Sequence, residues 1–159
     1  MQDLLTQFDI LFVAAVLLLT LVYLYTIGKD FAVTIVLAQY MALGTLLFVP
    51  FLNELDFSIG GMPNWLTKVA MLLVLIIVFA YLQINNGYFE PNIVPSSWET
   101  PIFAIIFTGM FAAASIGFMD AAALEGISDI LKKLFVEEPI ADLWFLATPL
   151  ALLFIKGDA

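Results

Sequence analysis

Four long apolar stretches, separated by short polar links, place the strongest constraint on how this chain can fold. They cover about residues 10–27, 31–52, 65–82 and 101–119. A helix needs about 20 predominantly apolar residues to cross the hydrocarbon core of a bilayer. All four stretches meet that need, so the sequence predicts four membrane-spanning helices.

A fifth apolar stretch covers residues 139–155. It is short for a span and contains Asp142 and Pro149. A tilted or kinked fifth span fits it, and so does a re-entrant or surface-packed helix. We therefore expect an all-α, polytopic transmembrane bundle of four or five spanning helices, forming one domain over residues 1–159.

Residues 128–137, "SDILKKLFVE", have a different pattern. As a helix, this segment places its apolar and charged residues on opposite faces: Ile130, Leu131, Leu134 and Phe135 against Asp129, Lys132, Lys133 and Glu137. It is too short and too charged to span. The pattern favours an amphipathic helix lying in the plane of the membrane interface.

Composition agrees with a lipid environment and excludes several functions. Hydrophobic residues make up 64% of the chain and charged residues 12%, against about half and about a quarter in soluble domains. The net charge of −9 leaves no basic patch for a nucleic-acid partner. The absence of Cys and His removes thiol chemistry, ordinary zinc sites and a Ser-His-Asp triad. We therefore expect a non-enzyme without metal or cofactor.

Residues at the edges of the stretches predict where the helices start and stop. Asp9 is expected to cap the first span, and Asn64 the third. Thr100 is expected to cap the fourth, with Pro101 in its first turn, unless Ser96 and Glu99 form a capping box for an earlier start. That helix either ends at the interface near Asp120 or continues through "AAALE" to Gly126.

Small residues recur every fourth position along the fourth span: Gly109, Ala113, Gly117 and Ala121. They would form one ridge, and small residues at this spacing let two membrane helices approach closely. The ridge predicts either a contact between subunits or packing within one chain. Thr34, Ala38 and Ala42 form a lesser stripe on the second span and could be its counterpart.

Three polar residues are candidates for intramembrane sites. Gln39 lies in the middle of the second span, where it would line a polar pathway or make an interhelical hydrogen bond. Asp120 and Asp142 have two interpretations. Each is either an intramembrane carboxylate, which indicates a functional site because a charge in hydrocarbon is costly, or an interfacial residue near a helix end. If both were buried together, a proton or cation path would follow.

The N-terminal hairpin resembles the colicin V production protein family of small bacterial inner-membrane proteins. The likeness lies in Asp9 before the first span, the tight turn Gly28-Lys29-Asp30-Phe31, and a second span with small and polar residues, within about the first fifty positions. The family usually has a more basic turn and ends in an amphipathic tail, whereas here an apolar stretch follows the amphipathic segment. The resemblance implies a bacterial cytoplasmic membrane, an auxiliary role and no catalytic residues.

These observations predict a non-enzymatic integral membrane protein that acts by helix–helix association. Its partners would be the lipid bilayer and either further copies of itself or other membrane proteins, as a homo-oligomer or a small subunit of a larger assembly. The alternative is a small channel or transporter that uses Gln39, Asp120 or Asp142.

Overall fold

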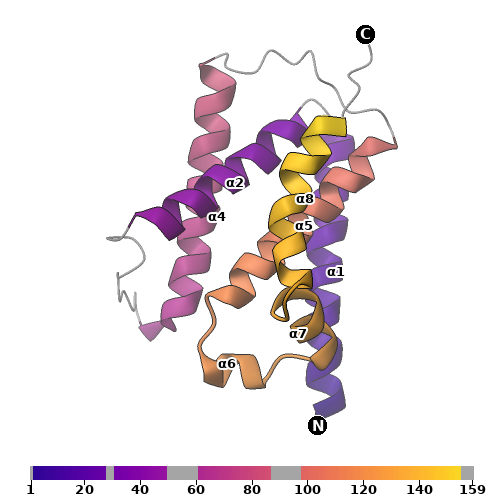
Figure 1. Cartoon of the computed structure of the whole chain (residues 1–159), viewed down its shortest axis with the longest axis vertical. Coiled ribbons are helices and arrows are strands. Elements are labelled where there is room, and N and C mark those ends of the chain that lie inside the picture. Colours follow the sequence, from indigo (N-terminus) through magenta and orange to yellow (C-terminus); the bar gives the residue numbers. More distant parts are fainter. Residues whose placement is uncertain (1, 28–30, 50–60, 87–97, 155–159) are drawn as a thin grey trace.

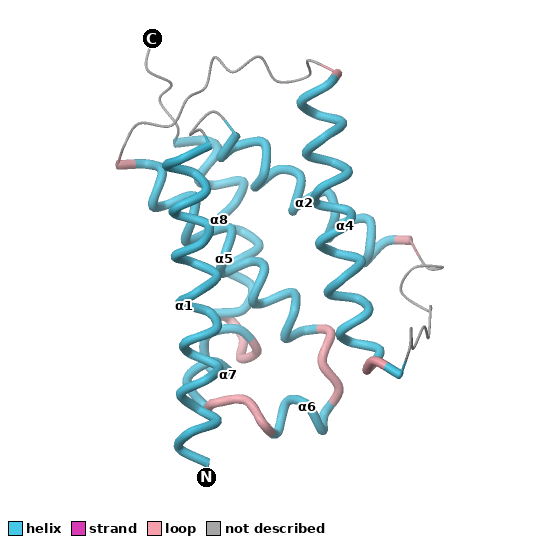
Figure 2. The backbone as a smooth tube through the Cα atoms, turned by 180° about the vertical axis from the view of Figure 1, so that it is seen from behind, coloured by secondary structure: helices cyan, strands magenta, loops and turns pink. Residues whose placement is uncertain are grey.

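A computed structural model describes residues 2–27, 31–49, 61–86 and 98–154, and all regular structure in these ranges is helical (Figures 1 and 2). The helices are α1 (Gln2–Ile27), α2 (Ala32–Phe48), α4 (Asn64–Asn85), α5 (Glu99–Gly117), α6 (Ala121–Glu125), α7 (Asp129–Phe135) and α8 (Ile140–Phe154). The predicted all-α class is confirmed for the described part of the chain. Each of the five apolar stretches overlaps one of the longer helices.

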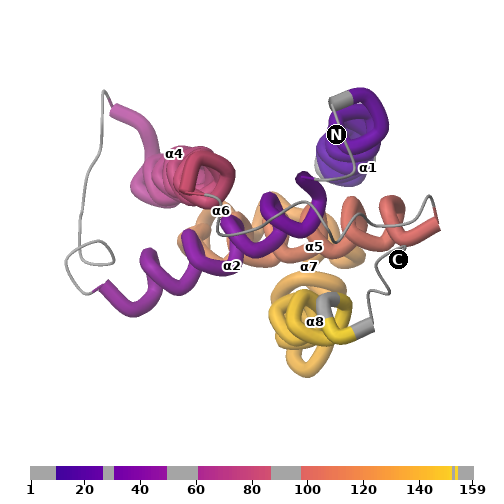
Figure 3. The backbone as a smooth tube through the Cα atoms, turned by 90° about the horizontal axis from the view of Figure 1, so that it is seen from above, coloured from indigo at the N-terminus to yellow at the C-terminus, as the bar shows by residue number. Residues whose placement is uncertain are grey.

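The helices are arranged in three layers, which are clearest from above (Figure 3). The oblique helices α2 and α5 form the middle layer. Helices α1 and α4 lie on one side of it, and α7 and α8 lie on the other. Helix α5 is the centre of the fold, because it contacts α1, α2, α4, α7 and α8.

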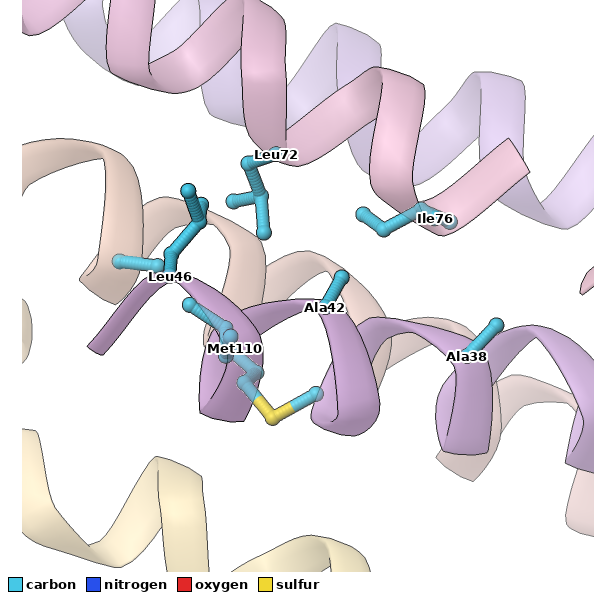
Figure 4. Close-up of a cluster of buried hydrophobic side chains, with 8 residues drawn as sticks. Ala38, Ala42, Leu46, Leu72, Ile76 and Met110 are labelled. Atoms are coloured by element: carbon cyan, nitrogen blue, oxygen red, sulfur yellow. The ribbon is translucent and has the colours of Figure 1, made fainter. Parts of the chain in front are cut away.

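The contact between α2 and α4 is built on small residues. Ala38 and Ala42 of α2 are fully buried and cluster with Leu72 and Ile76 of α4 and with Met110 of α5 (Figure 4). An alanine has no side chain beyond Cβ, so the two helices can approach closely and pack their larger side chains around the contact. The predicted small-residue stripe on α2 therefore lies within the core of the molecule.

Helix α7 packs on α5 through half of its predicted apolar face. Leu131 and Phe135 are buried in a cluster with Ala112, Ala113 and Ile116 of α5. Ile130 and Leu134, the other two apolar residues of α7, are exposed. The four residues share one face of α7, as predicted, but only Leu131 and Phe135, one turn apart, pack on α5, while Ile130 and Leu134 stay exposed.

Several helix ends differ from the predicted ones. Helix α1 begins at Gln2, so Asp9 lies inside it, because nothing in the first turns interrupts a helix. Pro63 occupies the N-cap position of α4, so the predicted cap at Asn64 is wrong. Helix α5 begins at Glu99, with Thr100 already in its first turn.

The second span is also shorter than predicted. Helix α2 ends at Phe48, and Val49 is extended. Proline disfavours the helical conformation in the residue before it, which accounts for an end at the residue preceding Pro50. The last predicted positions, 50–52, lie outside the described residues, as does the turn over 28–30.

Two of the described helices, α4 and α5, are long and apolar enough to cross a membrane. They differ in burial, since 67% of the apolar window of α5 is buried inside the molecule and only 17% of that of α4. The apolar segments Ile10–Thr26, Ala32–Phe48 and Ile140–Ala151 are shorter. A bundle of four or five spans stays a prediction.

Candidate functional site

The small-residue ridge is divided between two helices. Gly109, Ala113 and Gly117 lie on α5, which ends at Gly117. Asp120 then starts α6 by accepting a hydrogen bond from the Ala123 amide at 2.8 Å. A capping aspartate favours a new helix start over continuation of α5, because its carboxylate accepts the hydrogen bond that a backbone carbonyl would accept in a continuous helix. The prediction of one ridge along one helix is therefore wrong at Ala121, which belongs to α6.

Gly109 is covered within the chain by Trp144 of α8. A Cβ atom added at Gly109 would overlap the six-membered ring of that indole. The ring is fixed from two sides: Nε1 donates to the Leu134 carbonyl at 2.9 Å, and Phe135 stacks on it with centroids 5.5 Å apart. Gly109 thus allows α8 to pack closely on α5. This agrees with the alternative in which the ridge serves packing within one chain.

Gly117, at the other end of the ridge, is open. It is exposed, and a Cβ atom added there would meet nothing within 4 Å. Ala113 and Gly117 both line an apolar groove of about 440 Å³ to which all the described helices except α1 contribute. Lys68 of α4 is the one charged side chain among the described residues that line it. The groove therefore leaves the α5 part of the ridge accessible at Gly117, while Ala113 is buried.

Gln39 is fully buried between α2 and α5. Its Nε2 donates to the Phe107 carbonyl at 3.2 Å, while its Oε1 has no hydrogen-bond partner among the described residues. Gln83 of α4 is similar, with Nε2 donating to the Met41 sulfur at 3.3 Å. Both amides thus join neighbouring helices. Gln83 is not among the residues predicted from the sequence, because it lies beyond the predicted end of its span.

The two candidate carboxylates are exposed. Asp120 caps α6, and Asp142 lies in the first turn of α8. An acid in the first turn is favoured by the partial positive charge at a helix N-terminus. Since both are exposed, they do not form the buried pair on which a proton or cation path would depend. No three acidic side chains within the described ranges lie close enough together to hold a metal ion.

Two buried hydroxyls on α5 are not among the candidate residues predicted from the sequence. Thr108 Oγ1 and Ser115 Oγ have no hydrogen-bond partner among the described residues. Both line a cavity between α1, α5 and α7. The sequence feature that could have identified them is their spacing of seven residues, which places both hydroxyls on one face of the helix.

Comparison with family models, curated proteins and solved structures finds no match for this chain. The resemblance of the N-terminal hairpin to the colicin V production proteins therefore stays a prediction.

Proposed function

We propose that this chain is an integral membrane protein that acts by association with another transmembrane helix, contributed by a second copy of itself or by another membrane protein. The proposal has two parts. The first is that lipid solvates the outer helices. The second is that the partner helix enters the groove beside Gly117.

The exposed apolar surface of α4 supports the proposal that the molecule lies in a membrane. Only 17% of its apolar window is buried, and large side chains such as Val74, Ile77 and Tyr81 are more than half exposed. Exposing apolar surface to water costs about 25 cal/mol per Å². Acyl chains are the solvent in which a helix of this composition can present such a face without that cost.

The order of the helices supports repeated crossing. Helices α1, α4 and α8 run upward in Figure 1, while the oblique helices α2 and α5 slope back downward, and α2 ends near mid-height. A polytopic chain must alternate in this way. Helix α8, with 15 residues, has a rise of about 22 Å against about 30 Å of hydrocarbon, so it would cross only with local adjustment of the bilayer.

The open position at Gly117 carries the proposal of association. In lipid, helices are held together by close packing rather than by the hydrophobic effect, and small residues allow that packing. Gly109 is already used by Trp144, but Gly117 faces the groove with free space above it. A partner helix carrying its own small residue could approach the backbone of α5 there.

The geometry supports the transporter alternative less well. It requires Gln39, Asp120 or Asp142 to line a water-filled path. Gln39 is sealed between helices and bonded to the Phe107 carbonyl, and both carboxylates lie exposed at helix starts. Association is therefore the function we propose.

The test is the oligomeric state in lipid nanodiscs and in native membranes, with Gly117→Leu as the variant. We expect the natural chain to form a defined assembly, and Leu at this position to weaken it at least tenfold, because the side chain fills the space that the partner backbone needs. Gly44→Leu is the matched control, since a Cβ at Gly44 also meets nothing within 4 Å but Gly44 does not line the groove.

Two results would remove the proposal. One is a natural chain that is monomeric in nanodiscs and co-purifies with no other protein after crosslinking in native membranes. The other is a Gly117→Leu variant that assembles as well as the natural chain.

A further inference from the structure

A second hollow lies on α5, apart from the groove that contains Gly117. It has a volume of about 130 Å³ and is bounded by α1, α5 and α7. Phe12 and Val16 of α1 line one side, and Thr108, Ala112 and Ser115 of α5 line the other. Helix α1 lies directly against α5 here (Figure 3). Every described residue that lines the cavity is uncharged.

Thr108 and Ser115 carry two of the three buried hydroxyls that have no hydrogen-bond partner among the described residues, and the third, on Thr67 of α4, does not line this cavity. A helical threonine commonly donates to the carbonyl four residues earlier, and Thr20, Thr26 and Thr45 do so at 2.8, 2.7 and 2.9 Å. Thr108 and Ser115 make no such bond and have no other partner among the described residues. Thr108 is also almost completely buried. A buried hydroxyl without a partner is unfavourable, so an occupant that bonds to it would be stabilised.

We propose that this cavity binds a small neutral molecule with a ring-sized apolar body and an oxygen atom at each of two opposite ends. The volume of about 130 Å³ limits the apolar body to one ring, because a cavity of about 150 Å³ holds benzene. Neutrality follows from the lining, because a charge buried without a counter-charge is strongly disfavoured. The site does not depend on the proposed association.

The spacing of the hydroxyls sets the length of the molecule. Seven residues of helix correspond to a rise of about 10 Å. A hydrogen bond of about 2.8 Å at each end leaves about 5 Å between the two ligand oxygens, which suits a benzene ring substituted at its 1 and 4 positions. Phe12, at the edge of the cavity, is exposed on the outer face of α1, so in a bilayer the molecule would enter through the hydrocarbon.

Three probes of the same shape test this site: hydroquinone, p-cresol and p-xylene, with two, one and no oxygens. Binding to the full chain in detergent is followed by NMR of ¹³C-labelled methionine methyl groups. Met119 lines the cavity, whereas Met62 is exposed and does not line it, so Met62 reports non-specific effects. Each probe is compared between variants, which cancels its partition into detergent.

We expect hydroquinone to shift the Met119 signal saturably. Thr108→Val and Ser115→Ala should each weaken hydroquinone about fivefold, the usual effect of one lost hydrogen bond, and leave p-xylene unchanged. One of the two variants should weaken p-cresol. Thr45→Val, which removes a hydroxyl already bonded to the Met41 carbonyl, should change nothing. Ala112→Phe should abolish binding of all three probes by filling the cavity.

The proposal is overturned if hydroquinone gives no saturable shift at Met119. It is also overturned if hydroquinone binds equally well to the natural chain and to both hydroxyl variants, since the oxygens would then play no part. Thermal unfolding of each variant, measured beside binding, separates lost affinity from lost structure.

Discussion

Gly109 shows how one residue can decide the packing of two helices. Its missing side chain leaves the space taken by the Trp144 ring, and that ring is fixed by its bond to Leu134 and its stacking on Phe135. The ring therefore cannot turn aside without losing both contacts. A glycine in the interior of a helix is normally unfavourable, and here the close contact with α8 offsets that.

Gly109→Ala should destabilise the fold by about 1–3 kcal/mol, the usual range for overpacking a core. Gly44→Ala, at a position with free space, should be neutral or stabilising, because alanine favours helix more than glycine does. Thermal unfolding followed by circular dichroism in detergent measures both. If the two variants unfold at the same temperature, Trp144 does not pack on Gly109 as the structure indicates.

At the scale of the element, the sequence predicts where helices exist better than where they end. Long apolar runs identified the five longer helices because their pattern is strong and local. Where a helix such as α1 or α5 starts or stops depends on a small difference in free energy between capping the helix and extending it by further residues. The break after Gly117 cannot be predicted for this reason, because Asp120 and the "AAALE" segment are compatible both with an end and with a continued helix until the chain packs.

The candidate site was harder to predict, because it depends on contacts between distant segments. A spacing of four identified the ridge but could not show that Trp144, far along the chain, covers Gly109 while Gly117 stays open. Likewise, the composition of α5 could not show that Thr108 and Ser115 face a cavity beside α1. The spacing of residues in the sequence shows which of them share a helix face, but the tertiary structure determines which other segments pack against that face.

The cap of α6 gives a prediction at this scale. Asp120→Ala removes the acceptor of the Ala123 amide proton, which should cost about 1 kcal/mol. Asp120→Asn keeps an acceptor oxygen and should be nearly neutral, since asparagine caps as well as aspartate. Amide hydrogen exchange at Ala123 measures the effect, and we expect about fivefold faster exchange in the alanine variant. Equal protection in all three proteins would show that the cap does not hold α6.

At the scale of the whole molecule, the alternating direction of the helices defines two ends. The start of α4 and the short helix α6 lie at the lower end in Figure 1, and the end of α4 lies at the upper end. If the molecule spans a bilayer along this axis, exposed residues at the two ends face opposite aqueous compartments. The middle of α4 then faces lipid.

The natural chain contains no cysteine, so single cysteines can report this arrangement without background. Met62 lies just before the start of α4 and Glu125 is the last residue of α6, and both are exposed. Because these helix ends lie at the lower end in Figure 1, Met62→Cys and Glu125→Cys should react with a membrane-impermeant maleimide from the same side of sealed vesicles. Asn86→Cys, at the upper end, should react from the other side. Ile77→Cys, exposed in the middle of α4, should react from neither side until detergent is added, because a thiol in hydrocarbon stays protonated and out of reach of the reagent. Labelling of Met62→Cys and Asn86→Cys from one side would contradict a membrane-crossing α4, and labelling of Ile77→Cys in intact vesicles would mean that water, not lipid, covers this helix.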